Sequence, residues 1–141
     1  MDFYTAMDIL ASGLTAERVR MDVTSSNLAN ANTTRTAEGG PYKRRDPVFS
    51  AVAATSQFST EMNSALQAVE VSNITTDTAA PRQVYQPGHP DADAQGYVAM
   101  PNVNSIEEMV NMITASRAYD AGITAMRSLV EMAERALSLG K

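Results

Sequence analysis

The chain has 141 residues, a formal net charge of −5 at pH 7 and no cysteine, which excludes a disulfide framework, a thiolate zinc site and a cysteine nucleophile. The acidic pI of about 4.7 argues against a nucleic-acid partner. Alanine supplies 22 of the apolar residues, whereas Leu, Ile, Val and Phe together number only 26. The fraction of the chain made up of Leu, Ile, Val and Phe lies just under the roughly 20% typical of chains that fold alone. We therefore expect this protein to fold fully only against partners.

The first residues are not expected to form a secretion signal. They lack the basic stretch and the continuous apolar stretch of a cleaved signal peptide. No apolar run in the chain approaches the roughly 20 residues that a membrane span requires. We therefore expect no membrane-spanning segment, and export without a cleaved signal if the protein leaves the cytoplasm.

Residues 3–28 carry the pattern of an amphipathic helix. The apolar positions that define its stripe are Met7, Leu10, Leu14, Met21 and Leu28. Their spacing of three, four or seven residues predicts a coiled-coil-like seam. Glu17 and Thr24 interrupt the seam after Leu14, so we expect this helix to depend more on neighbouring subunits than the C-terminal one does.

Residues 31–104 contain all six prolines of the chain, which makes long helices there improbable. Valine and tyrosine are frequent over 68–74, 83–85 and 96–100, and short strands are predicted in these three places. The segment as a whole is predicted to be irregular, with turns around 39–41 and 86–90.

Asp91 and Asp93 begin a pattern similar to a calcium-binding loop. The pattern fails at its end, because its twelfth position is Asn102 instead of glutamate. His89 lies nearby, but no second residue suggests a catalytic pair. A metal-dependent enzyme using His89, Asp91 and Asp93 is therefore the least favoured interpretation. A polar turn is favoured, and we predict no metal, no cofactor and no enzymatic activity.

The second helix is predicted to begin at Ser105, because Glu108 stands three residues later and completes a capping box. Gly140 is a plausible C-terminal cap. The stripe of this helix includes Met109, Met112, Ile113, Tyr119, Ile123, Met126 and Val130. It is wider than the seam of two helices requires, which predicts contacts with more than one neighbour.

These elements predict a mainly α protein with a small β and loop region. The helices of residues 1–30 and 105–141 are expected to pack as an antiparallel coiled-coil hairpin, with residues 31–104 projecting from it. Part of the C-terminal stripe would then remain exposed as an assembly surface.

Several segments resemble flagellar basal-body rod and hook proteins. Residues 26–34 (SNLANANTT) and 39–44 (GGPYKR) are similar to the N-terminal signature of that family. Residues 85–93 (YQPGHPDAD) and 96–104 (GYVAMPNVN) resemble the rod branch of the family more specifically, as do 107–112 and 116–119.

The resemblance implies a structural subunit that is exported unfolded through the flagellar type III apparatus. It would polymerise helically with copies of itself and other rod proteins, near the basal-body ring, in the periplasm-spanning rod that serves as drive shaft and export channel. Its terminal helices would line the inner tube.

The stripe residues of both helices are then candidate assembly residues, and Tyr42, in the basic cluster of residues 42–45, is a candidate subunit contact. Asn27, Asn30 and Asn32 are expected to cap the first helix and to shape its exit turn. The alternative is a self-contained helical coiled-coil adaptor or secreted protein of unrelated function.

Overall fold

The structure is a computed structural model that describes residues 3–53 and 66–139. Its elements, in chain order, are α1 (Phe3–Ala29), β1 (Arg45–Ala53), β2 (Gln67–Thr76), β3 (Arg82–Tyr85), β4 (Tyr97–Met100) and α3 (Ser105–Leu139). The expected Gly140 cap lies outside the described residues.

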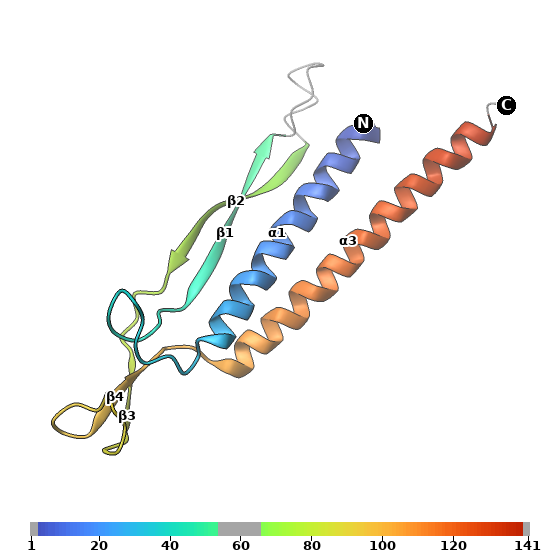
Figure 1. The fold of residues 1–141 in the computed structure, drawn as a ribbon. Helices are drawn as coiled ribbons and strands as arrows, with labels where there is room; N and C mark the ends of the chain where they lie inside the picture. The colour runs from blue at the N-terminus through green and yellow to red at the C-terminus, as the bar shows by residue number, and fades with distance from the viewer. Residues whose placement is uncertain (1–2, 54–65, 140–141) are drawn as a thin grey trace.

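The two long helices lie side by side and run in opposite directions, as Figure 1 shows. α1 has 27 residues and α3 has 35, and the C-terminal end of α3 extends beyond the first turn of α1. The prediction of long terminal helices packed as an antiparallel hairpin is confirmed. Their joint length makes the molecule elongated, because an α-helix rises about 1.5 Å per residue.

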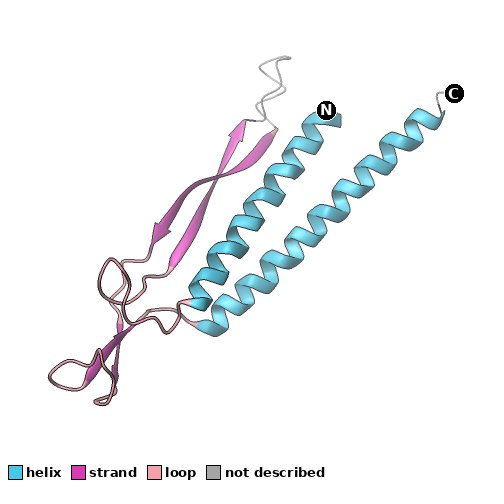
Figure 2. Ribbon diagram, viewed as in Figure 1, coloured by secondary structure: helices cyan, strands magenta, loops and turns pink. Residues whose placement is uncertain are grey.

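Strands β1 and β2 form an antiparallel ribbon that lies along α1, on the side away from α3 (Figures 1 and 2). Ser12 on α1 binds the ribbon directly, because its Oγ accepts a hydrogen bond of 3.1 Å from the backbone N of Val69. This bond satisfies a backbone donor that the open edge of β2 would otherwise expose. α1 is thus packed on two sides, by the ribbon and by α3.

The nine-residue strand β1 is absent from the sequence-based prediction. The strand contains Pro47, and proline removes a backbone donor from a ladder. In the structure Pro47 pairs with Ile74 at the edge of a two-stranded ribbon, where a missing donor on the outer side is tolerated. β2, at ten residues, is also longer than the predicted strand.

β3 and β4 form a second antiparallel ribbon in two of the predicted places. The connection between them is the polar turn favoured above. Asp93 Oδ1 accepts hydrogen bonds of 2.9 Å from the backbone N atoms of Gln95 and Tyr97, and His89 Nδ1 accepts one from Asp91 N. These groups satisfy the backbone of the turn.

Candidate assembly interface

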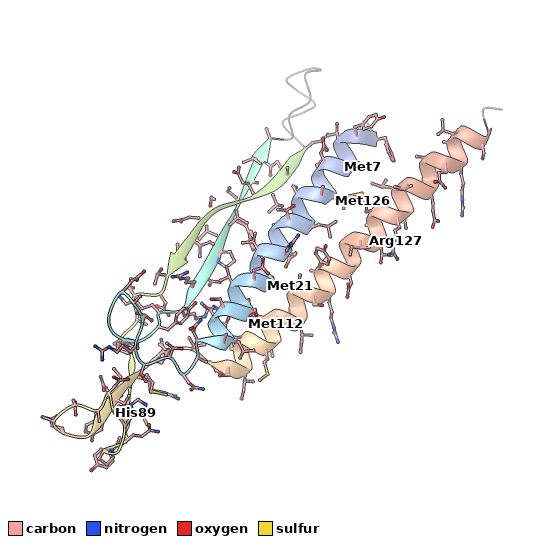
Figure 3. All side chains as sticks on the ribbon, in the orientation of Figure 1. Met7, Met21, His89, Met112, Met126 and Arg127 are labelled. Atoms are coloured by element: carbon pink, nitrogen blue, oxygen red, sulfur yellow. The ribbon has the colours of Figure 1, made fainter. Side chains whose placement is uncertain are left out.

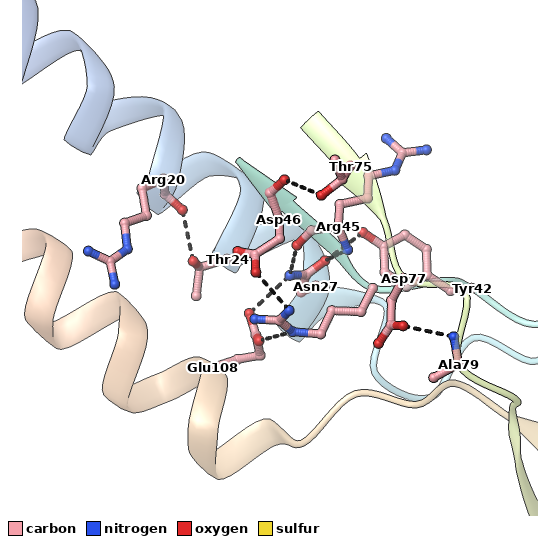
Figure 4. Close-up of polar contacts among 11 residues, drawn as sticks. Arg20, Thr24, Asn27, Tyr42, Arg45, Asp46, Thr75, Asp77, Ala79 and Glu108 are labelled. Carbon is pink, nitrogen blue, oxygen red and sulfur yellow. Dashed lines mark hydrogen bonds and ion pairs between the residues drawn. The ribbon is translucent and has the colours of Figure 1, made fainter. Parts of the chain in front are cut away.

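Asn27 lies at the centre of a polar cluster that joins three elements (Figure 4). Its side chain is 1% exposed. Its Nδ2 donates to the backbone O of Arg45 at 2.8 Å and to Glu108 Oε2 at 3.0 Å. Its Oδ1 accepts from Arg45 N at 3.0 Å and from the Tyr42 hydroxyl at 2.9 Å. All four hydrogen-bonding positions of the amide are therefore used inside the fold.

Glu108 is equally buried, at 1% exposed, and its carboxylate accepts hydrogen bonds from Arg44 and Asn27. Arg44 Nε donates to Glu108 Oε1 at 2.7 Å, and Arg44 Nη1 lies 3.1 Å from Asp46. Burial disfavours the charged guanidinium, but the hydrogen bonds to Glu108 and Asp46 outweigh it and raise the pKa of Arg44. We call the group Asn27, Tyr42, Arg44 and Glu108 the clasp. It ties the end of α1, the entry to β1 and the first turn of α3 together.

The predicted capping box at Ser105 is wrong, because Glu108 turns into the clasp instead of back to the helix start. Asn104 caps α3: its Oδ1 accepts from the backbone N of Ile106 at 3.1 Å and of Glu107 at 3.5 Å. No pattern in the sequence marks Glu108 as a member of the inward face, because a charged residue carries no hydrophobic signal.

The three asparagines expected to cap α1 differ in role. Asn30 does close the helix, because its Nδ2 donates to the backbone O of Ser26 at 2.9 Å. Asn27 belongs to the clasp and caps nothing. Asn32 is exposed. Tyr42 is buried in the clasp instead of presented to a neighbour, with Arg45 placed 5.9 Å above its ring.

The face that α3 turns toward α1 runs through Glu108, Ala115 and Gly122, at intervals of seven residues. Ala115 is fully buried, and a Cβ added to Gly122 would lie 2.8 Å from Leu14 Cδ2. Helix packing this close requires small side chains at the contact. The stripe predicted for α3 used the neighbouring positions instead, because small and charged residues carry no apolar signal.

The structure separates the predicted stripe residues into two groups. Half-buried side chains are Met7, Leu10, Leu14, Met21 and Leu28 on α1, and Met112, Tyr119, Ile123 and Met126 on α3. Exposed ones are Met109, Ile113 and Val130, at 45%, 55% and 39%. Figure 3 shows the two helices with four of these methionines labelled.

Four exposed apolar side chains form a stripe over the first two turns of α3: Ile106, Met109, Val110 and Ile113. We call it the α3 ridge. At about 100° per residue, the ridge lies almost opposite Ala115 and Gly122 on the helix, so α1 cannot cover it. Beyond Ile113 the same outer face becomes charged. An apolar stripe of this kind marks a protein contact.

Neither helix of the described chain has a stretch apolar enough to cross a membrane. Over the same residues no group of three or more histidine, aspartate or glutamate side chains is placed to hold a metal ion. The notable surfaces are thus the α3 ridge and an apolar groove between α1, the ribbon and α3, whose lining includes Gly13, Phe49 and Ala118.

The chain thus combines a hairpin of terminal helices with an exposed apolar ridge and an outer β ribbon, and it matches models of flagellar rod families. Family models match both ends of the chain: "Flagella basal body rod protein" over residues 7–35, and "Flagellar basal body rod FlgEFG protein C-terminal" over residues 94–139.

Full-length relatives narrow the assignment. The chain is 41% identical to the flagellar basal-body rod protein FlgC of Bacillus subtilis, with both chains covered completely. It is 39% identical to FlgC of Borreliella burgdorferi (99% of this chain, 98% of the relative) and 39% identical to FlgC of Salmonella typhimurium, again over both complete chains. The chain belongs to the FlgC family of flagellar basal-body rod proteins, and it is a structural subunit of the rod.

Proposed function

We propose that this subunit assembles helically with copies of itself and with other rod proteins, and that the α3 ridge is one of its contact surfaces. The observation that carries the proposal is the exposure of the ridge: Ile106, Val110 and Ile113 are 71%, 57% and 55% exposed on a helix whose opposite face is already packed. Covering these side chains removes apolar surface from water, which stabilises the contact by roughly 25 cal/mol for each Å² of apolar surface buried.

The proposal includes the finer expectations from the sequence. The helices of residues 1–30 and 105–141 form the assembly core as coiled-coil-like packing between subunits, and the segment 31–104 lies outside them. The rod so formed spans the periplasm as drive shaft and export channel, beside the basal-body ring, and the subunit reaches it through the export apparatus without a cleaved signal. Its role is mechanical, with no cofactor and no catalysis.

The half-buried stripe residues are part of the proposal as well. Met112, Tyr119, Ile123 and Met126 lie at the border between the face toward α1 and the outside, so a neighbouring helix could complete their burial. The same holds for Met7, Leu10, Leu14, Met21 and Leu28 on α1. Val130, Met132 and Leu137 extend the exposed apolar surface toward the C-terminal end of α3.

The test is Ile113→Asp in cells that carry the variant as their sole copy of this gene. Ile113 is 55% exposed, so the monomer should keep its stability to within about 0.5 kcal/mol. In the rod, the carboxylate would be buried without a partner at a cost of several kcal/mol, so the cells should stop swimming and rods should not extend. Thr114→Asp, one residue away on the exposed side of α3, is the matched control and should swim. Normal swimming of the Ile113→Asp strain would refute the role of the ridge.

A further inference from the structure

The exposed side of α1 has a regular pattern. Its exposed residues are Tyr4, Asp8, Ala11, Thr15, Arg18, Asp22, Ser25 and Ala29, which recur at alternating intervals of four and three. They form one straight stripe along the helix, which neither the ribbon nor α3 covers. Apart from Tyr4 its side chains are small or charged, a composition that lets another helix approach closely.

The outer face of α3 repeats at the same intervals. The ridge residues Val110 and Ile113 are followed on this face by Arg117, Asp120, Thr124 and Arg127. Figure 3 shows Arg127 on the side of α3 that points away from α1. Arg117 and Asp120 are exposed and, within the described residues, lie in no ion pair.

The two stripes match in charge when they are placed antiparallel. With Asp22 opposite Arg117, Arg18 lies four residues before Asp22 and Asp120 lies three residues after Arg117. Arg18 therefore falls within one residue of Asp120, and a second opposite-charge pair can form. Arg18 and Asp22 are also exposed and outside any ion pair among the described residues. A shift of one heptad along the helices brings neither pair together, so the charges select this register.

The same register also covers Val110 and Ile113 of the α3 ridge, whereas Ile106 lies beyond the end of α1 at Ala29. It places Ile113 opposite Ser25 and Val110 opposite Ala29, where small side chains leave room for the larger ones. Like charges meet only at Asp8 and Glu131, where α3 is already highly exposed and solvent screening is strongest.

We propose that the outer face of α3 in one copy of this chain packs antiparallel on the exposed stripe of α1 in the next copy, in the register set by Asp22–Arg117 and Arg18–Asp120. This inference rests on the proposed rod function and names the partner of the α3 ridge. The two surfaces are different parts of one molecule, so the contact is head-to-tail and repeats from copy to copy. In this contact, α3 is shifted along α1 by about three residues relative to the packing of the same two helices within one chain. Neighbouring copies are therefore displaced by roughly 4 Å along the helices.

Charge reversal tests the pairing. Asp22→Arg and Arg117→Asp, each alone, place like charges opposite one another at every copy-to-copy contact, and each should reduce or abolish swimming. The double variant Asp22→Arg with Arg117→Asp restores the pair and should recover swimming. The double variant Asp22→Arg with Arg135→Asp has the same net charge but no restored pair, so it should not recover. Melting of the purified single variants should match the unmodified protein, since all these side chains are exposed.

Cysteine cross-linking tests the register separately, because the chain has no cysteine of its own. Thr15→Cys with Thr124→Cys should give a ladder of disulfide-linked copies in oxidised basal bodies. Within one chain these positions lie on faces that point away from each other, so they cannot bridge. Thr15→Cys with Thr114→Cys should give no ladder, since residue 114 lies about 15 Å farther along α3.

Failure of rescue by the matched double variant, or absence of the ladder from basal bodies that contain the Thr15→Cys, Thr124→Cys chain, would overturn the copy-to-copy contact. If the Ile113→Asp strain were still non-motile, the rod function would stand and the ridge would face another partner. Normal swimming of the Ile113→Asp strain would instead remove the basis of both proposals.

Discussion

The side-chain amide of Asn27 satisfies the polar groups of three chain segments at once. It pairs with both backbone groups of Arg45, as a neighbouring strand would, and also binds the Tyr42 hydroxyl and Glu108. Glu108 and Tyr42 are buried and the two bonds to Arg45 are partly buried, so loss of the amide would leave polar groups that water reaches poorly. The clasp therefore compensates for a small apolar core, whose buried members are Ala16, Val23, Ala31, Tyr42, Val98 and Ala115.

Removal of this amide should be costly. Asn27→Ala would leave the Glu108 carboxylate with Arg44 as its remaining partner and the Tyr42 hydroxyl without its acceptor. We expect a loss of about 3 kcal/mol in the free energy of unfolding. Asn32→Ala, at an exposed asparagine three residues after Ala29, should change it by less than about 0.5 kcal/mol. Chemical denaturation of the purified monomers measures both, and equal stabilities would show that the clasp does not hold the fold.

Gly96 has a position that other residues cannot occupy without strain. Its φ is +84°, and a Cβ there would lie 2.8 Å from Tyr85 Cε2 and 3.2 Å from Pro87 Cβ. Gly96→Ala should therefore weaken the β3–β4 ribbon by about 1–2 kcal/mol. Amide exchange at Gln86, whose N donates to the Gly96 carbonyl, reports the opening of this turn and should become faster. Gly88→Ala is the control, because nothing lies within 4 Å of a Cβ at that position; similar exchange in both variants would contradict the prediction.

At the scale of the elements, the helices followed from their periodicity and β1 did not. The apolar spacing in α3 continues over 35 residues, about ten turns, and tolerates single interruptions, whereas β1 contains a proline, which weakens a strand signal. The predicted stripe shares Met112, Tyr119 and Met126 with the inward face of α3. It is displaced by one residue at the alternate positions, where the contact depends on the small size of Ala115 and Gly122. Hydrophobic patterns in a sequence indicate where large apolar residues lie, and they do not indicate contacts made by small residues.

Two helical glycines test this packing. Gly122→Ile should destabilise the hairpin by about 2 kcal/mol, because the added atoms must displace Leu14. Gly13→Ala should instead stabilise the monomer by about 0.5–1 kcal/mol, since its Cβ meets nothing within 4 Å and alanine favours the helix. Thermal unfolding followed by circular dichroism separates the two effects. A gain in stability from Gly122→Ile would show that the helices are not in close contact there.

At the scale of the molecule, some faces of the two helices pack inside the chain and others stay exposed. α1 is held between the ribbon and α3, and the clasp closes one end of the hairpin. The outer face of α3 and the exposed stripe of α1 are left without partners inside the chain. A polymer can use such unpaired faces on every subunit, because a contact that is weak in one pair is repeated along the whole assembly.

The sequence by itself determined the two terminal helices, their hairpin class, the strands near 68–74, 83–85 and 96–100, and the resemblance to rod proteins. Only the tertiary structure decided which face of α3 packs on α1, that β1 exists, and that Glu108 is a buried partner of Asn27 and Arg44 instead of a helix cap. The physical reason is that periodicity specifies which residues share a face, while burial depends on which other segment covers that face. Small side chains and buried charges reveal their role only when that segment is in place.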